Sequence, residues 1–288
     1  MKLGVITDGI SRDLGHACSV MSEYDLEWAE LQFIGDKEVG DLDASERQSA
    51  LETIRHHQKR VSCISRHLFA GMVMASSKPG DPTHVKHMDA LKRCIAMAHQ
   101  FDCQTVRIMT GKKEQILWGH NGAEKWNVAH GAWEAQLPLI APAVELARSE
   151  GVTLVVETGN GTMVNSATTA RRLIDDLDAK DVLKVLWDPA NNCWCKEEAY
   201  PRGYDALRGG YLGHIHIKDV FADPPSATLE IRPIGEGQLA PHFQPIAKAL
   251  RADGYEGVIS FESVYHSGDG DFEAGFRANI ETFKSLFE

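Results

Sequence analysis

The most constraining feature of this chain is an alternation of short apolar runs with longer stretches of helical periodicity. Eight runs have the length and apolar character of β-strands, and turn-forming or polar residues bound each of them. The predicted strands are Lys2–Thr7, Ala29–Phe33, Val61–Ser65, Thr105–Met109, Thr153–Glu157, Lys184–Asp188, Leu212–Ile217 and Val258–Glu262. Helices are predicted at Ser45–Gln58, Pro82–Gln100, Trp133–Ser149, Ser166–Leu177, Pro241–Asp253 and Phe272–Phe287, with weaker patterns over 9–26 and 200–211.

Strands that alternate with helices pair in parallel and are joined by right-handed crossovers. Eight such units in 288 residues fit a closed barrel better than an open doubly wound sheet. An open sheet would usually carry a glycine fingerprint after its first strand, but Thr7-Asp8-Gly9-Ile10-Ser11 is not one. We therefore predict an α/β protein, a single (β/α)8 TIM barrel domain over residues 1–288.

Charge and composition exclude several functional classes. The formal net charge of −11 repels phosphate backbones, so no nucleic-acid partner is expected. No run approaches 18 consecutive apolar residues, so no membrane span is expected. Six cysteines without a recognisable signal sequence suggest reduced thiols and a cytoplasmic protein.

Four consecutive predicted strands carry a metal-ligating residue at or near their carboxyl ends. Glu157, Asp188 and Glu262 end their runs, and His216 lies near the end of the run that includes His214. The carboxyl ends of barrel strands converge on one mouth, where three carboxylates would repel one another unless a cation compensated them. Carboxylates with one imidazole suit Mn²⁺, Mg²⁺, Co²⁺ or Zn²⁺.

Residues two apart on a strand face the same side, so His214, His216 and Lys218 are expected to point into the barrel. His216 lies nearer the mouth, whereas His214 is better explained as a hydrogen-bonded supporting histidine. For Lys218, contact with a substrate oxyanion and an ion pair with Asp219 or a rim acid stay open. Arg107 lies inside the fourth predicted strand, where an ion pair within the barrel is favoured over contact with a substrate acid.

The strand-end motifs resemble those of the xylose-isomerase-like superfamily of TIM barrels. They are Glu157, Asp188-Pro189-Ala190-Asn191, Gly213-His214-Ile215-His216-Ile217-Lys218-Asp219, Gly235-Glu236-Gly237 and Phe261-Glu262-Ser263. The sequence is most similar to sugar-phosphate isomerase/epimerase-type proteins, including ketose 3-epimerases and inosose dehydratases. The resemblance implies one divalent metal, preferentially Mn²⁺, on Glu157, Asp188, His216 and Glu262. It also implies that Glu157 and Glu262 act as the catalytic acid/base pair.

Four further residues are candidate substrate-binding groups: His67, Asn191, Lys218 and Arg232. His67 follows the third predicted strand, and a hydrogen-bonded loop histidine is the alternative. Arg232 lies in the loop after the His216 strand, where it could neutralise a substrate anion or form a salt bridge that closes the loop.

The resulting hypothesis is a metal-dependent isomerase or epimerase that abstracts a proton beside a metal-chelated carbonyl of a small keto-sugar, polyol or sugar acid. A dehydratase of inosose type, using the same metal site, is the first alternative. A barrel that binds metal and sugar without turnover is the second, because Met163 and Asn191 replace residues found in ketose epimerases. The resemblance makes a homodimer possible, although no sequence feature identifies an interface.

Overall fold

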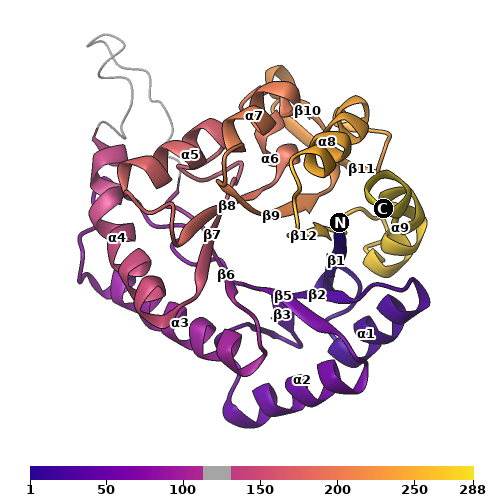
Figure 1. Ribbon diagram of the computed structural model, residues 1–288, viewed down its shortest axis with the longest axis horizontal. Coiled ribbons are helices and arrows are strands. Elements are labelled where there is room, and N and C mark those ends of the chain that lie inside the picture. Colours follow the sequence, from indigo (N-terminus) through magenta and orange to yellow (C-terminus); the bar gives the residue numbers. More distant parts are fainter. Residues whose placement is uncertain (113–130) are drawn as a thin grey trace.

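A closed barrel of eight parallel strands forms the centre of the computed structural model, which describes residues 1–112 and 131–288 (Figure 1). The barrel strands are β1 (Lys2–Ile6), β2 (Trp28–Leu31), β5 (Arg60–Ser65), β6 (Thr105–Ile108), β7 (Thr153–Glu157), β8 (Leu183–Trp187), β9 (Leu212–Ile217) and β12 (Val258–Phe261). Their order around the barrel is β1-β12-β9-β8-β7-β6-β5-β2. Each corresponds to one predicted strand, so the predicted (β/α)8 TIM barrel is confirmed.

Helices surround this barrel. They are α1 (Leu14–Glu23), α2 (Ala44–His56), α3 (Pro82–Gln100), α4 (Ala132–Glu150), α5 (Ala167–Asp176), α6 (Pro189–Cys193), α7 (Tyr204–Leu207), α8 (Ala240–Ala252) and α9 (Phe272–Phe287). Short single turns lie at Thr7–Gly9, Ala199–Gly203 and Pro224–Ser226. The weak patterns over 9–26 and 200–211 correspond to α1 and the short α7. Among the described residues, no helix combines the length and apolar composition that a bilayer crossing requires.

Side-chain caps fix where several of these helices begin. The carboxylate of Asp43 accepts a hydrogen bond from the backbone N–H of Glu46, whose side chain accepts one from Asp43 in return. Ser166 and Thr169 form the same reciprocal box at the start of α5. Such caps satisfy backbone donors that the first turn of a helix leaves without partners.

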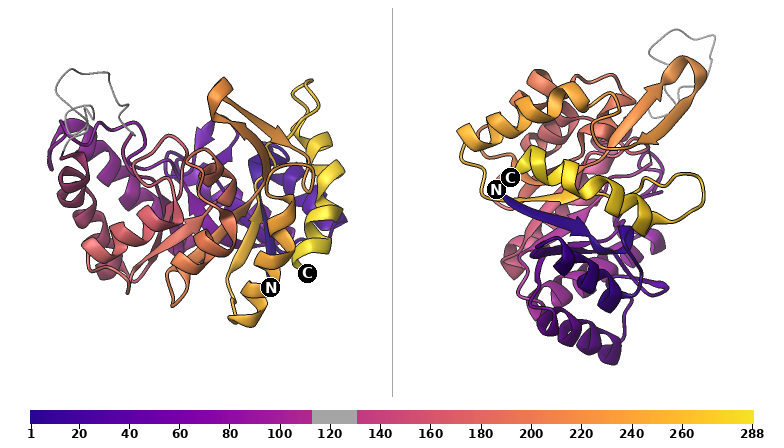
Figure 2. Two further views of the ribbon diagram at one scale, coloured as in Figure 1. Left: turned by 90° about the horizontal axis from the view of Figure 1, so that it is seen from above. Right: turned by 90° about the vertical axis from the view of Figure 1, so that its right-hand side faces the viewer.

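Two antiparallel hairpins interrupt the βα pattern, and the sequence analysis predicted neither. The first pairs β3 (Phe33–Ile34) with β4 (Lys37–Glu38), and the second pairs β10 (Asp219–Asp223) with β11 (Thr228–Arg232). The β10–β11 hairpin rises from one end of the barrel, opposite the end at which the N-terminus lies (Figure 2, left). Arg232, expected in a loop, is therefore the last residue of a strand.

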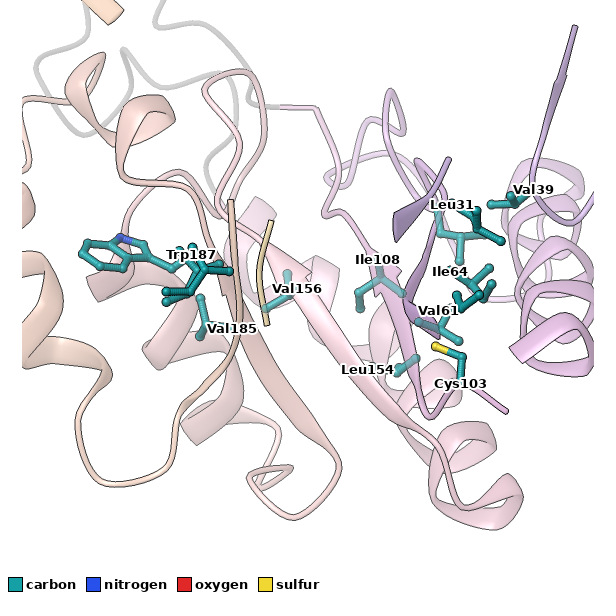
Figure 3. Packing of buried hydrophobic residues seen from close by; sticks show 14 of the residues in the cluster. Leu31, Val39, Val61, Ile64, Cys103, Ile108, Leu154, Val156, Val185 and Trp187 are labelled. Carbon is teal, nitrogen blue, oxygen red and sulfur yellow. The ribbon is translucent and has the colours of Figure 1, made fainter. Parts of the chain in front are cut away.

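Side chains alternate along the barrel strands and form two separate layers, one outside the barrel and one inside it. One set packs outward against the helices in a continuous apolar core, part of which Figure 3 shows with Leu154, Val156 and Trp187. The other set points into the barrel, where Cys63, Val155 and Leu186 form a separate small apolar cluster. Glu157 and Asp188 follow Val155 and Leu186 at the inward-facing spacing of two, which places both carboxylates toward the barrel interior.

Candidate metal centre

Four side chains from adjacent barrel strands meet at the carboxyl ends of those strands. Glu157 ends β7, Asp188 follows β8, His216 lies on β9 and Glu262 follows β12. Their potential ligand atoms all lie within 4.8 Å of one another. The first three residues are buried, and the side chain of Glu262 retains 19% of its exposure. The structure thus brings together all four residues that the sequence analysis expected to surround one metal ion.

His216 presents a nitrogen to this cluster that has no hydrogen-bond partner. Its Nδ1 is buried, 3.6 Å from Glu157 Oε1 and 3.5 Å from Glu262 Oε2, and makes no hydrogen bond. Its Nε2 lies 2.9 Å from Glu30 Oε1, so an Nε2–H that donates there leaves the Nδ1 lone pair facing the carboxylates. A buried lone pair among carboxylate oxygens is the donor arrangement that a divalent cation requires, so these residues fit the implied metal.

The carboxylates around His216 also govern its affinity for a proton. Burial lowers the pKa of His216, but Glu30 and the carboxylates of Glu157 and Glu262 together raise it well above its usual value. The ring therefore lies in a field that attracts positive charge. A proton on Nδ1 and a metal ion beside it would satisfy the same field, so the two compete.

Glu30 supports both histidines from inside the barrel, and the sequence analysis missed it. It lies on β2, is fully buried, and its Oε2 lies 2.7 Å from His214 Nε2. Ser65 also donates a hydrogen bond to its Oε1. Burial alone would raise the pKa of Glu30, yet His216 and His214 hold it well below the usual range. His214 thus has the supporting position that strand alternation predicted.

Lys218 forms ion pairs with two of the four clustered residues, Asp188 and Glu262. Its ammonium lies 2.5 Å from Asp188 Oδ2 and 2.7 Å from Glu262 Oε2. The ion pair with rim acids is therefore formed, whereas Asp219 binds backbone groups of the hairpin region instead. Burial raises the pKa of Asp188 to about 7, because Lys218 offsets only part of that effect and Glu262 repels the second charge.

Arg107 on β6 neutralises Glu157. Its Nη1 donates to Glu157 Oε2 at 2.9 Å, and both side chains are nearly inaccessible. Burial would raise the pKa of Glu157, but the guanidinium outweighs it and the pKa is lowered. This is the ion pair within the barrel that the sequence analysis favoured for Arg107. The Nε and Nη2 groups of Arg107 make no hydrogen bond within the described residues.

The backbone after β8 fixes Asp188. Its Oδ1 accepts hydrogen bonds from the backbone N–H groups of Ala190 (3.0 Å) and Asn191 (3.3 Å) at the start of α6. The Asn191 side chain donates to the carbonyl of Thr158 at 3.0 Å. Asn191 is half-buried beside the cluster, and its two hydrogen bonds connect the loops after β7 and β8.

His67 and Arg232 lie outside the group of side chains that contact one another around His216. His67 Nδ1 lies 2.7 Å from Glu38 Oε1, and 43% of its side chain is exposed. Arg232 pairs with Glu230 and lies over the ring of Phe221 on the hairpin. Both side chains thus have a local partner, as the structural alternatives required. A contact with substrate stays a prediction for both residues.

A cavity of about 570 Å³ opens beside Glu262, a volume within the range of small-molecule sites. Its lining includes Asp8, Arg12 and Gln32 from the loops after β1 and β2. Burial raises the pKa of Asp8, although the backbone N–H of Phe33 and the charge of Arg107 oppose it. Asp8 is a second residue near the site that the sequence analysis did not select, although it follows directly on a predicted strand.

Comparisons with known proteins agree with this architecture. The chain matches the family model described as Xylose isomerase-like TIM barrel over residues 18–286. No curated protein matches the chain in sequence.

Three solved structures share the fold over nearly the full length of both chains. The 3-keto-D-glucoside 4-epimerase YcjR from E. coli has 16% identity and a TM-score of 0.72, and the alignment covers 99% of this chain and 98% of that one. The probable 3-DHS dehydratase AsbF from Bacillus anthracis has 16% identity and a TM-score of 0.70, covering 96% and 98%.

The third is a xylose isomerase-like TIM barrel protein from Mycobacterium smegmatis in complex with magnesium. It has 16% identity and a TM-score of 0.66, and the alignment covers 95% of this chain and 89% of that one. At such identities the likeness to these structures shows the fold alone. The family model, however, spans most of the chain, and so the protein belongs to the xylose isomerase-like TIM barrel family.

Proposed function

We propose that this protein is a divalent-metal-dependent isomerase or epimerase acting on a small keto-sugar, polyol or sugar acid. The observation that carries the proposal is the convergence of Glu157, Asp188, His216 and Glu262 around the unpartnered Nδ1 of His216. Three carboxylates and an imidazole nitrogen at the mouth of a TIM barrel form a metal site beside the usual position of substrate. The epimerase and dehydratase names of two solved neighbours are consistent with such chemistry.

The proposed cofactor is one divalent ion, with Mn²⁺ favoured and Mg²⁺, Co²⁺ and Zn²⁺ as alternatives. The oxygen-rich donor set supports this group of ions, and one neighbour is a magnesium complex. When bound, the ion would supply Lewis-acid polarisation of a substrate carbonyl or hydroxyl oxygen.

Glu157 and Glu262 are the proposed proton-transfer groups. Glu262 is the more accessible and borders the cavity of about 570 Å³, so it is the carboxylate that a substrate meets first. Its neighbour Lys218 holds the pKa of Glu262 below its usual value despite burial, so the carboxylate is ionised and able to accept a proton. Glu157, held ionised by Arg107, would serve the opposite face of the substrate.

Asn191, Lys218, His67 and Arg232 are proposed to contact the substrate. Lys218 and Asn191 adjoin the clustered carboxylates and suit hydroxyl or carbonyl oxygens near the reacting carbon. His67 and Arg232 lie on the loop after β5 and on the β10–β11 hairpin, so they suit the distal end of the substrate.

Solvent-hydrogen exchange tests the proposal. The Mn²⁺-loaded protein is incubated in deuterated water with a panel of ketoses and sugar acids, and deuterium at carbon is measured by mass spectrometry. We expect incorporation at one carbon of at least one compound, and its loss in Glu262→Gln. Glu256→Gln is the matched control, because Glu256 is exposed just before β12 begins, at the opposite end of the strand.

The outcomes separate the alternatives. A metal-loaded protein that exchanges no carbon-bound hydrogen in any compound contradicts proton transfer. Tight sugar binding under those conditions instead favours a barrel that binds without turnover. Exchange that persists undiminished in Glu262→Gln removes Glu262 from the mechanism.

Dehydration is the second candidate, and the position of Lys218 favours it. Its ammonium lies beside Glu262 and is held protonated, because Asp188 and Glu262 raise its pKa despite burial. Such a donor can give its proton to a hydroxyl group on the carbon next to the one deprotonated, so that the C–O bond breaks, water leaves and the electrons of the former C–H bond form a C=C bond. A product lighter than its substrate by one water identifies this reaction, whereas a product of unchanged mass identifies an isomerase or epimerase.

A further inference from the structure

A second cavity lies at the end of the barrel opposite the candidate metal centre. Its volume is about 620 Å³, and its walls come from the first residues of several barrel strands together with the ends of α2 and α3. Four lining residues are the first residues of barrel strands: Lys2 of β1, Trp28 of β2, Arg60 of β5 and Val258 of β12. Because parallel strands all begin at the same end of a barrel, this cavity is separate from the mouth where Glu262 lies.

Positive charge gathers in this cavity although the chain as a whole is acidic. The lining contains one acidic residue, Asp102, and four basic residues that are charged at neutral pH: Lys2, Arg55, Lys59 and Arg60. The formal net charge of the protein is −11. A concave surface of the opposite sign focuses its field on small counter-ions and raises their local concentration.

Two of these cations have no acidic partner in the structure. Within residues 1–112 and 131–288, neither the Lys2 ammonium nor the Arg55 guanidinium forms an ion pair, and both side chains are exposed. Arg60 has only a long contact of 3.5 Å with the exposed Glu27. Charges left unpaired around one cavity favour an anion more than the scattered ion pairs of an ordinary surface do.

The ring of Trp28 holds two of the cations in place. Lys2 Nζ lies 5.2 Å and the Arg60 guanidinium carbon 4.3 Å from the ring centre, so both cations are attracted to one aromatic ring. Lys59 is anchored differently, because its ammonium donates to the carbonyl of Leu26 at 2.9 Å. Fixed cations lose less side-chain entropy when an anion binds, which strengthens binding.

Neutral hydrogen-bonding groups complete the lining. Gln100 ends α3, Gln104 directly precedes β6 and Thr105 begins β6, whereas the hydroxyl of Ser62 on β5 already donates to the carbonyl of Ala29. Phosphoryl groups have several acceptor oxygens and bind best where such donors accompany arginine and lysine.

We propose that this cavity is a binding site for a small phosphorylated compound or free oligophosphate. The proposal does not depend on the function of the metal centre at the other end of the barrel. The cavity volume of about 620 Å³ and the acidic remainder of the surface favour a small molecule over a polymer.

Calorimetric titration with pyrophosphate tests the proposal, using the full chain as purified in buffer without added divalent metal. We expect saturable binding at one site. The variant Lys2→Gln/Arg55→Gln removes the two unpaired cations without leaving an acid unpaired, and is expected to weaken binding about tenfold or more. Lys86→Gln/Lys248→Gln makes the same change in net charge at exposed positions elsewhere and should bind as the unmodified protein does.

A third comparison distinguishes the two ends of the barrel. Asp188→Asn changes the candidate metal centre and should leave pyrophosphate affinity unchanged. The single variant Arg55→Gln, on the exposed face of α2, replaces the double variant if the latter melts at a lower temperature. The proposal is overturned if the unmodified protein shows no saturable binding, if the cavity variants bind as tightly as it does, or if the Lys86/Lys248 or Asp188 variants lose binding equally.

Discussion

The two ring nitrogens of His216 face different surroundings, and this difference defines the candidate metal centre. Nε2 faces Glu30 deep in the barrel, and Nδ1 faces the carboxylates at the mouth. A carboxylate behind a metal-binding histidine fixes its tautomer and increases the basicity of the ligating nitrogen. Under the proposed function, Glu30 is a positioning residue for His216 although it is buried below the mouth.

Glu30→Gln is expected to weaken Mn²⁺ binding roughly 10- to 100-fold, the usual effect of removing a group behind a ligating histidine. The amide loses the charge that orients His216 and increases its basicity. Calorimetric titration with Mn²⁺ measures the change. Glu27→Gln, at an exposed position near the start of β2, removes the same charge and should bind Mn²⁺ normally. Equal affinities in the Glu30 variant and the unmodified protein would disprove this role.

The protonation of Asp188 predicts how metal affinity depends on pH. Its pKa in the folded, metal-free protein is about 7, above the ordinary 3.8. A metal ligand must be ionised, so the ion has to displace this proton at lower pH. The apparent affinity for Mn²⁺ is therefore expected to rise from about pH 6 to about pH 8, as measured by titration at each pH. An affinity that is independent of pH across this interval contradicts the assignment.

The raised pKa of Asp188 also affects the stability of the metal-free protein, which is expected to fall as pH rises. Between the unfolded and folded pKa values of Asp188, the folded state binds more protons than the unfolded chain, so stability falls as pH rises from about 4 to about 7. Melting temperatures of metal-free protein should show a smaller decline in Asp188→Asn, which has no proton to lose at this position.

At the scale of elements, the alternation of side chains along a strand explains what could be predicted from the sequence. All eight barrel strands were predicted, because their apolar runs are distinct and bounded by turn residues. Alternation along β9 placed His214, His216 and Lys218 inside the barrel correctly. The same rule applied to β2 would have found Glu30, a charged residue at an inward position within an apolar run.

The sequence analysis predicted neither hairpin. β3 and β4 are two residues each, too short for a periodic pattern, whereas β10 and β11 are five residues each and turn Val220, Ala222, Leu229 and Ile231 to their more buried face. Contacts distant in sequence hold the second hairpin in place, since the Asp219 carboxylate accepts hydrogen bonds from the backbone N–H groups of Val220, Gly235, Gly237 and Leu239. These contacts leave no pattern in the sequence, whereas the alternation of polar and apolar residues in Thr228–Arg232 is a strand signal that the sequence analysis did not use.

Gly237→Ala tests the attachment of this hairpin. A Cβ at Gly237 would lie 2.6 Å from the carbonyl oxygen of Val220 and would also collide with the Asp219 carboxylate. We expect a loss of about 1–3 kcal/mol in the free energy of unfolding, measured with urea. Gly161→Ala is the control, because a Cβ there meets no atom within 4 Å. Equal stability of the two variants would contradict the close approach.

For the whole molecule, a bound ion should stabilise the folded state because the ligand cluster is assembled only when the barrel is closed. At an Mn²⁺ concentration 100 times its Kd, the expected gain is about 2.7 kcal/mol, visible as a higher melting temperature. Asp188→Asn/Glu262→Gln removes two donors and should melt at the same temperature with and without Mn²⁺. A melting temperature of the unmodified protein that Mn²⁺ leaves unchanged would refute the metal centre.

The four clustered donors come from one contiguous half of the barrel, β7, β8, β9 and β12. The segments after β1 and β2 contribute Asp8, Arg12 and Gln32 to the wall of the cavity beside Glu262. The proposed metal ligands and this wall of the cavity therefore come from different stretches of the chain. Under the proposed function, loops grafted after β1 and β2 from other family members would change this wall of the cavity while the four proposed metal ligands stay in place.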